Sequence, residues 1–154
     1  MSTATFSGVA HIALVVRDMT TSVHFYEDVL GFERIGEVTE GPPSEGHPRR
    51  LMRHPGSGMT LGIHEPHRRS ADRFDPQRTG LDHVAVTVPD RATLDAWSTR
   101  LSEHDVEHSP TRDVGYAQFV SFCDPDGIAW EIWLPTARDD QQWPTSAQEA
   151  APHG

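Results

Sequence analysis

Two histidines and one glutamate are the residues of this 154-residue chain whose types and positions point to chemistry. His11 and His83 occupy matching places in two similar segments, each within a short run of apolar and β-branched residues. Glu131 lies on another apolar run, between Trp130 and Trp133, where a carboxylate is costly to bury without a cation. Two imidazoles and one carboxylate suit a divalent ion and leave positions open for water or a substrate. These residue types therefore predict a metal site.

The two histidines correspond because the chain contains an internal repeat. GVAHIALVVRD at residues 8–18 matches GLDHVAVTVPD at residues 80–90, at an offset of 72 residues. RLMRHPGSGMTLGIH at residues 50–64 matches FVSFCDPDGIAWEIW at residues 119–133, at an offset of 69 residues. Two blocks in the same order, at nearly the same separation, indicate two copies of one module.

Each copy has the pattern of a βαβββ module. Its first block is short and β-branched, which suits a strand. Asp18 and Asp90 follow as expected N-caps, apolar residues then recur at helical spacing, and Gly31 is expected to end the first helix. The turns PGSG and DPDG should connect the last two strands of each copy. The strands expected after the two helices are 32–38, 48–54, 59–65, 105–112, 116–123 and 127–134.

The predicted organisation is a pair of modules with a linker and a tail. The first module covers residues 8–65 and the second covers residues 80–134. Residues 66–79, rich in arginine, form the linker between them. Residues 135–154 have low complexity and are expected to form a C-terminal tail.

Composition excludes several classes of protein. The formal net charge of -10 disfavours nucleic-acid binding, which depends on Lys and Arg neutralising phosphates. Cys123 is the only cysteine, so neither an intrachain disulfide nor a cysteine-rich zinc site can form. The N-terminal segment lacks the features of a signal peptide, and the apolar run at 9–16 is too short to span a membrane. We expect a soluble cytoplasmic protein without nucleic-acid or membrane partners.

The paired modules resemble the vicinal oxygen chelate superfamily, which includes glyoxalase I, extradiol dioxygenases and bleomycin-resistance proteins. The resemblance covers residues 8–134 and rests mainly on GLDHVA at 80–85, DPDG at 124–127 and the Trp130-Glu131 pair. It implies an α+β fold in which two βαβββ modules form a cup-shaped, eight-stranded mixed sheet with helices on the outer face. It also implies a homodimer and a metal on the concave face.

In that superfamily, one position on the first strand and one on the last strand of each module face the metal. The resemblance therefore implies His11, His83 and Glu131 as ligands of a divalent ion (Fe, Zn, Ni or Mn). The fourth position falls on Gly62, which has no side chain to contribute. His64 lies two residues further and should share the face of Gly62, because side chains alternate along a strand. His64 is thus a candidate fourth ligand, pocket acid or base, or rim residue.

Three functions remain open at this stage. The first is a metal-dependent enzyme of isomerase or lyase type, acting on a small substrate that chelates the ion through adjacent oxygens. The second is an Fe(II) extradiol dioxygenase that cleaves a catechol, since two histidines and one carboxylate also suit that chemistry. In either enzyme His64 and Tyr116 are the candidate catalytic residues, because each could handle protons. The third is a metal-free protein that sequesters a drug, as bleomycin-resistance proteins do.

Overall fold

The computed structural model describes residues 6, 8–40, 48–66 and 71–136. Its internal contacts divide the chain into two compact units, residues 1–74 with 124–127, and residues 75–123 with 128–154. Residues 137–154 of the predicted tail lie outside the described part. None of the helices in the described ranges is long and apolar enough to cross a membrane.

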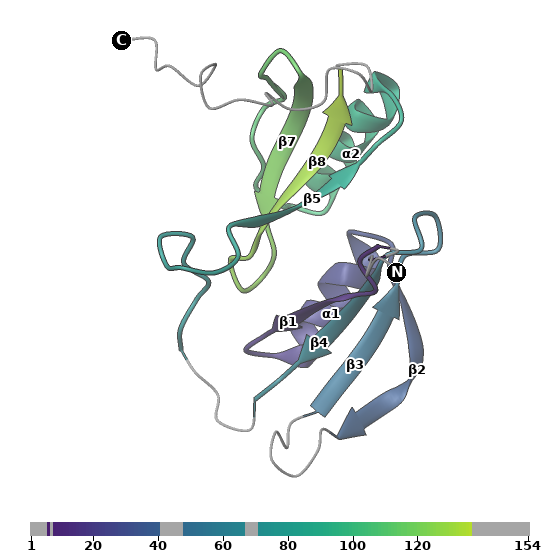
Figure 1. Cartoon of the computed structure of the whole chain (residues 1–154), viewed down its shortest axis with the longest axis vertical. Helices are drawn as coiled ribbons and strands as arrows, with labels where there is room; N and C mark the ends of the chain where they lie inside the picture. Colours follow the sequence, from purple (N-terminus) through teal and green to yellow (C-terminus); the bar gives the residue numbers. More distant parts are fainter. Residues whose placement is uncertain (1–5, 7, 41–47, 67–70, 137–154) are drawn as a thin grey trace, which may run out of the picture. The chain divides into compact units, whose positions relative to one another are not determined.

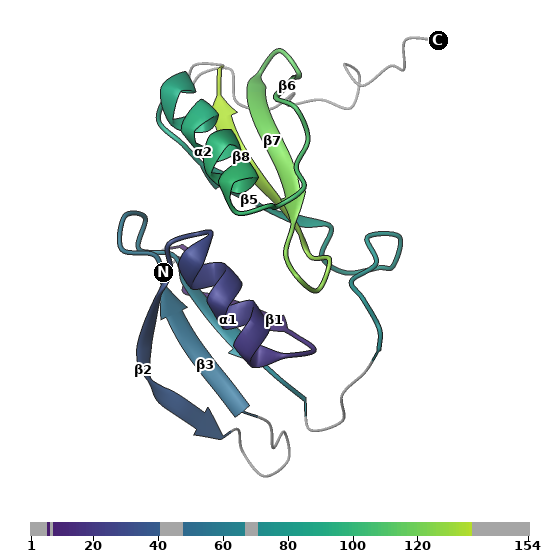
Figure 2. The same ribbon diagram turned by 180° about the vertical axis from the view of Figure 1, so that it is seen from behind.

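The first unit contains a four-stranded mixed sheet with one helix against it. Its elements are β1 (Ile12–Val15), α1 (Met19–Asp28), β2 (Glu33–Glu40), β3 (Pro48–Arg53) and β4 (Thr60–His64). The strand order is β1-β4-β3-β2, in which β1 and β4 are parallel and the other neighbours are antiparallel (Figure 1). Helix α1 covers one face of this sheet (Figure 2). Its Val23 and Tyr26 are buried, as are Met52, Leu61 and Ile63 on the sheet.

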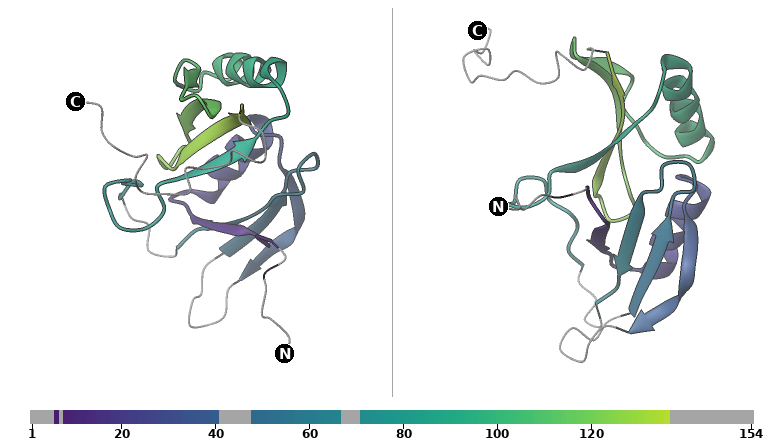
Figure 3. Two further views of the ribbon diagram at one scale, coloured as in Figure 1. Left: turned by 45° about the horizontal axis from the view of Figure 1, so that its top comes forward. Right: turned by 45° about the vertical axis from the view of Figure 1, so that its right-hand side comes forward.

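The second unit repeats this arrangement. Its elements are β5 (His83–Thr87), α2 (Arg91–Glu103), β6 (Arg112–Asp113), β7 (Ala117–Cys123) and β8 (Ala129–Pro135). The strand order is β5-β8-β7-β6, and again only the first and last strands of the module along the chain, β5 and β8, pair in parallel. Helix α2 lies against one face of the sheet (Figure 3). Leu94 and Leu101 on α2 and Trp130 and Ile132 on β8 are almost completely buried.

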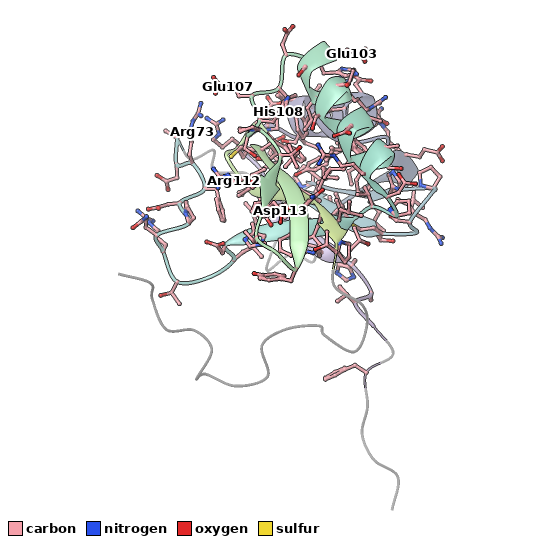
Figure 4. All side chains as sticks on the ribbon, turned by 90° about the horizontal axis from the view of Figure 1, so that it is seen from above. Arg73, Glu103, Glu107, His108, Arg112 and Asp113 are labelled. Atoms are coloured by element: carbon pink, nitrogen blue, oxygen red, sulfur yellow. The ribbon has the colours of Figure 1, made fainter. Side chains whose placement is uncertain are left out.

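These elements confirm the α+β class and the two βαβββ modules. The joining of the two sheets into one eight-stranded cup stays a prediction. One expected strand is much shorter than the sequence indicated: in place of 105–112 the structure has β6 and an isolated bridge between His108 and Phe122. Asp105 adopts a left-handed φ of 55° and Pro110 has no N–H to donate, so neither suits a continuous strand. His108, labelled in Figure 4, belongs to the segment between α2 and β6. Its Nε2 atom forms a hydrogen bond with the Ser102 hydroxyl, near the end of α2, at 2.8 Å.

Both helices begin at the aspartates that the sequence predicts as N-caps. The Asp18 carboxylate accepts a hydrogen bond from the Thr21 N–H, and the Asp90 carboxylate accepts one from the Thr93 N–H, each at 2.8 Å. Gly31 follows α1 with a φ of 75°, the left-handed conformation expected of a glycine at that point. The start of both helices and the end of α1 are therefore determined by local sequence.

The DPDG turn between β7 and β8 belongs to the first unit, where it packs against α1. Tyr26 donates its hydroxyl hydrogen to Asp124 at 2.7 Å, and both side chains are buried. Asp126 accepts hydrogen bonds from the Arg17 guanidinium at 2.7 Å and from the Ser22 hydroxyl at 3.1 Å. Buried carboxylates need such partners, since leaving them unpaired would cost far more than a lost hydrogen bond. The DPDG motif is thus a structural anchor as well as a turn.

The N-cap of α2 generates a pH-dependent prediction. Hydrogen bonds from the backbone N–H and the hydroxyl of Thr93 hold the pKa of Asp90 below its ordinary value of 3.8. The stabilisation is therefore present above that value and is lost as the pH falls through the lower folded-state pKa. Asn also caps helices but does not titrate. We expect D90N to unfold at a similar urea concentration near neutral pH and to lose less stability than the original protein in acid.

The measurement is the urea midpoint as a function of pH. A matched control is D105N, which removes a carboxylate from the opposite end of the same helix. This control should not weaken the loss of stability in acid, because a negative charge there opposes the helix dipole. If the urea midpoint of D90N fell in acid as much as that of the original protein, the assigned role of Asp90 would be contradicted.

Candidate metal-binding site

The parallel pairing of β5 with β8 brings a histidine and a glutamate to one face of the second sheet. His83 is paired with Ala129 and Ala85 with Glu131, so the two functional side chains lie diagonally across neighbouring strands. Residues that alternate with them, such as Trp130, face α2 and are buried. Trp130 therefore lies on the opposite face from Glu131 and does not enclose the carboxylate.

The distance between the two side chains suits a pair of metal ligands. His83 Nε2 lies 3.5 Å from Glu131 Oε2, and the side chains are 40% and 15% exposed. Two ligand atoms that each bind zinc at about 2.0–2.2 Å in a tetrahedral arrangement would lie about 3.3–3.6 Å apart. An imidazole nitrogen and a carboxylate oxygen are also the donor types that borderline divalent ions prefer. The pair fits a metal ion in both chemistry and spacing.

Each member of the pair is oriented by a second side chain. His83 Nδ1 lies 2.6 Å from the Asp82 carboxylate, which can only accept, so the proton is on Nδ1 and Nε2 is left facing Glu131. The Ser121 hydroxyl donates to Glu131 Oε1 at 3.3 Å, which leaves Oε2 on the side of His83. Metal-binding histidines commonly donate their other N–H to a carboxylate in this way. Sequence reasoning missed Asp82 and Ser121, although Asp82 directly precedes His83.

Aromatic side chains adjoin the pair on the same face. Trp133 follows Glu131 by two residues and stacks on Phe119 with a centroid distance of 5.2 Å. Tyr116, the second predicted catalytic residue, contacts the same indole at 6.1 Å and is 42% exposed. We call Tyr116, Phe119 and Trp133 the aromatic row. The row offers a planar apolar surface next to the histidine–glutamate pair. Sequence reasoning identified the pair but not this row.

On the corresponding face of its sheet, the first unit has a glycine where the second unit has Glu131. Ala13 is paired with Gly62, as Ala85 is paired with Glu131, so the register places Gly62 where the second unit has its carboxylate. His11 is exposed and lies directly before β1. His64 is the last residue of β4 and is half-buried.

The structure thus brings His83 and Glu131 together, while His11 and His64 belong to the first unit. Among the His, Cys, Asp and Glu residues of the described ranges, no group of three or more is close enough to form a metal site. Within the described residues, the structure therefore shows a pair of potential ligands and not a complete metal site.

Comparisons with known proteins establish the family. The model of the Glyoxalase/Bleomycin resistance protein/Dioxygenase superfamily matches residues 8–132, and the chain belongs to this superfamily. The uncharacterized protein YaeR of Escherichia coli is 33% identical over 128 residues, which cover 81% of this chain and 94% of YaeR. Catechol-2,3-dioxygenase of Bacillus subtilis is 25% identical over 134 residues, which cover 87% of this chain but only 44% of that enzyme.

Solved structures show the same fold. A glyoxylase/bleomycin resistance protein/dioxygenase domain from a Frankia species has a TM-score of 0.77 and 29% identity, over 85% of this chain and 99% of that one. The fosfomycin resistance protein FosX of Listeria monocytogenes, in complex with Mn(II) and sulfate, has a TM-score of 0.63 and 20% identity, over 86% of this chain and 95% of that one. The predicted vicinal oxygen chelate relationship is confirmed.

Proposed function

We propose that this protein is a metal-dependent enzyme acting on a small substrate that carries adjacent oxygen atoms. Its ligands are His11, His83 and Glu131, and its ion is Fe, Zn, Ni or Mn. The observation that carries the proposal is the His83–Glu131 pair, spaced 3.5 Å apart and oriented by Asp82 and Ser121. The presence of Mn(II) in FosX and the inclusion of a catechol dioxygenase among the relatives are consistent with this role.

The side chains around the pair have distinct tasks. When bound, the divalent ion supplies Lewis acidity that polarises a carbonyl or hydroxyl oxygen of the substrate, which suits isomerase or lyase chemistry. Asp82 keeps His83 in the tautomer with a free Nε2. Tyr116 is positioned at the edge of the aromatic row, where its hydroxyl can donate a hydrogen bond or a proton to a substrate oxygen.

His11 completes the ligand set from the first unit. Its equivalence to His83 follows from the repeat and from the matching register of β1 with β4 and of β5 with β8. In a homodimer, which we also propose, the histidine comes either from the same chain or from the second copy. Both arrangements use the same residues and differ only in which chain supplies His11.

Loss of a ligand should release the metal. We expect H83A and E131Q to bind Zn²⁺ or Mn²⁺ more weakly by a larger factor than D82N, because D82N removes only an orienting partner, an effect typically of about 10–100-fold. The measurement is a competition titration of the metal-stripped protein with a chromogenic chelator. Matched controls are H24A and E103Q, which change exposed residues on α1 and at the end of α2.

The controls should bind metal as the original protein does. Equal affinity in H83A, E131Q and the controls would reject the metal site. That result, with unchanged binding of an aromatic drug, would support the metal-free sequestering protein instead.

Co-expression of two variants that each lack one ligand tests which chain of the proposed dimer supplies His11. H11A and H83A should each bind metal poorly as homodimers. If each site takes His11 from one chain and His83 from the other, a heterodimer of the two variants contains one intact site. We expect differently tagged, co-expressed H11A and H83A chains, purified through both tags, to recover half of the metal content of the original dimer. Absence of recovery would assign all three ligands to one chain.

An Fe(II) extradiol dioxygenase is the second candidate, and the aromatic row favours it. Trp133, stacked on Phe119 and contacted by Tyr116, provides a flat surface against which a catechol ring could pack beside the ligand pair. The 25% identity to a catechol dioxygenase points in the same direction.

Oxygen uptake separates the two candidates. For the dioxygenase, the iron-loaded protein should consume one O₂ per catechol, since both oxygen atoms enter the cleaved ring, and E131Q should abolish uptake. E103Q should retain it. Turnover of a hydroxy- or oxo-substrate with zinc, nickel or manganese, without oxygen uptake, would reject the dioxygenase and support the isomerase or lyase. The measurement uses an oxygen electrode with each metal in turn.

A further inference from the structure

Arg112 ends a row of side chains that crosses the sheet of the second unit. The edge strand β6 consists of Arg112 and Asp113, both labelled in Figure 4, and Arg112 is paired with Phe119 of β7. Phe119 is in turn paired with Trp133 of β8. Because directly paired residues project from the same face of a sheet, Trp133, Phe119 and Arg112 lie side by side on three neighbouring strands.

This row lies beside the His83–Glu131 pair. Trp133 follows Glu131 by two residues on β8 and therefore shares its face. Neighbouring strands are about 5 Å apart and two residues span about 7 Å along a strand, so the Cα atoms of Arg112 and Glu131 are about 12 Å apart. The stacked rings of Phe119 and Trp133 lie within this interval. A ligand that is held at the pair and extends over the rings therefore approaches Arg112.

The guanidinium group of Arg112 is exposed and unpaired. Within the described residues its side chain forms no hydrogen bond or ion pair, whereas Arg17, Arg34, Arg78 and Arg91 each contact a carboxylate. Carboxylates are plentiful in a chain with 23 acidic and 13 basic residues. Their absence around the Arg112 side chain leaves a cation available for another anion.

The carboxylate next to Arg112 in the sequence is held on the other face of the sheet. Asp113 accepts hydrogen bonds from the Gln118 amide at 2.9 Å and from the Gly115 N–H at 2.8 Å. The Gln118 side chain also accepts a hydrogen bond from Arg91, the first residue of α2, at 3.1 Å. Alternation along β6 thus places Asp113 on the face covered by α2 and Arg112 on the face of the ligand pair.

A charge on an edge strand can also serve to prevent pairing with another chain. That role would be served equally well by Lys or Glu. The planar fork of arginine differs, because it can bind both oxygens of a carboxylate and can stack against an aromatic ring. At the end of a row of stacked rings, these properties suit a flat anionic ligand.

We infer that Arg112 is a specificity-determining residue, which binds a carboxylate carried by the flat part of the substrate on the side away from its chelating oxygens. The inference rests on the function proposed above and deepens it. The substrate class becomes a planar carboxylate with two adjacent oxygen atoms at its opposite end. Arg112, the stacked rings and the His83–Glu131 pair all belong to one sheet of the second unit.

Two probes of the same shape test the role of Arg112. Protocatechuate is a catechol with a carboxylate on the far side of its ring, and its primary amide is a neutral analogue. The measurement is isothermal titration calorimetry of the zinc-loaded protein with each probe, since zinc has no redox chemistry and does not consume them. We expect the original protein to prefer the carboxylate. R112Q should weaken its binding by about 10-fold or more, as for other hydrogen bonds to charged groups, with little change for the amide.

Two further variants make the result specific. R112K keeps the positive charge without the planar fork and should retain part of the preference for the carboxylate. R78Q removes another exposed arginine of the second unit and changes the net charge equally, so it should leave both affinities unchanged. Thermal unfolding of each variant checks that the fold persists, and R112K carries the comparison if R112Q does not fold.

The outcomes separate this inference from the function on which it rests. If E131Q abolishes binding of both probes while R112Q leaves the ratio of their affinities unchanged, the metal site stands and the role of Arg112 is wrong. If R112Q removes the preference while E131Q has no effect, the role of Arg112 stands and the proposed metal site fails. An equal loss in R78Q and R112Q would assign the effect to net charge and reject the inference. Failure of both probes to bind the original protein would reject this substrate class.

Discussion

The parallel pairing of the first and last strands of each module is the constraint on which the candidate site depends. In a βαβββ module these two strands are furthest apart in sequence, and the helix between the first and second strands allows them to run in the same direction. The pairing places Ala85 opposite Glu131, and thereby places His83 diagonally across from the same carboxylate. The register is set by the core, because a shift of one residue would turn Trp130 and Ile132 away from α2. Packing on one face thus determines the chemistry of the other.

Much of this architecture could be predicted because the sequence contains two copies of the same module. The repeat showed which segments form the first strand of each module. The N-cap aspartates showed where the helices begin, and Gly31 showed where α1 ends. The structure preserves the alignment, since Gly62 and Glu131 have equivalent partners. Where the repeat is weak, prediction was poorer: the segment 105–112 contains only the start of β6. There Asp105 and Pro110 disfavour an extended ladder, although the composition otherwise permits one.

The supporting side chains of the site could not be derived in the same way. Asp82 and Ser121 have no periodicity that distinguishes them from other polar residues, and their roles depend on which atom of a neighbour they reach. Asp82 matters because it contacts Nδ1 of His83, and Ser121 because it contacts Oε1 of Glu131. The aromatic row likewise arises from pairing between β7 and β8, which places Phe119 beside Trp133. Such contacts are tertiary and appear only once the strands are in register.

The asymmetry between Gly62 and Glu131 bears directly on the substrate. With the proposed ligands His11, His83 and Glu131, a divalent ion would keep a charge of one positive unit, because glycine at position 62 adds no second carboxylate. Close to the proposed ion, this positive charge would attract an anionic chelating group. At longer range, the net charge of -10 of the whole chain would repel the same group. The aromatic row beside the pair could then hold an apolar or planar part of the same molecule. Under the proposed function, these features would favour a substrate with an ionised oxygen pair at one end and a flat apolar group at the other.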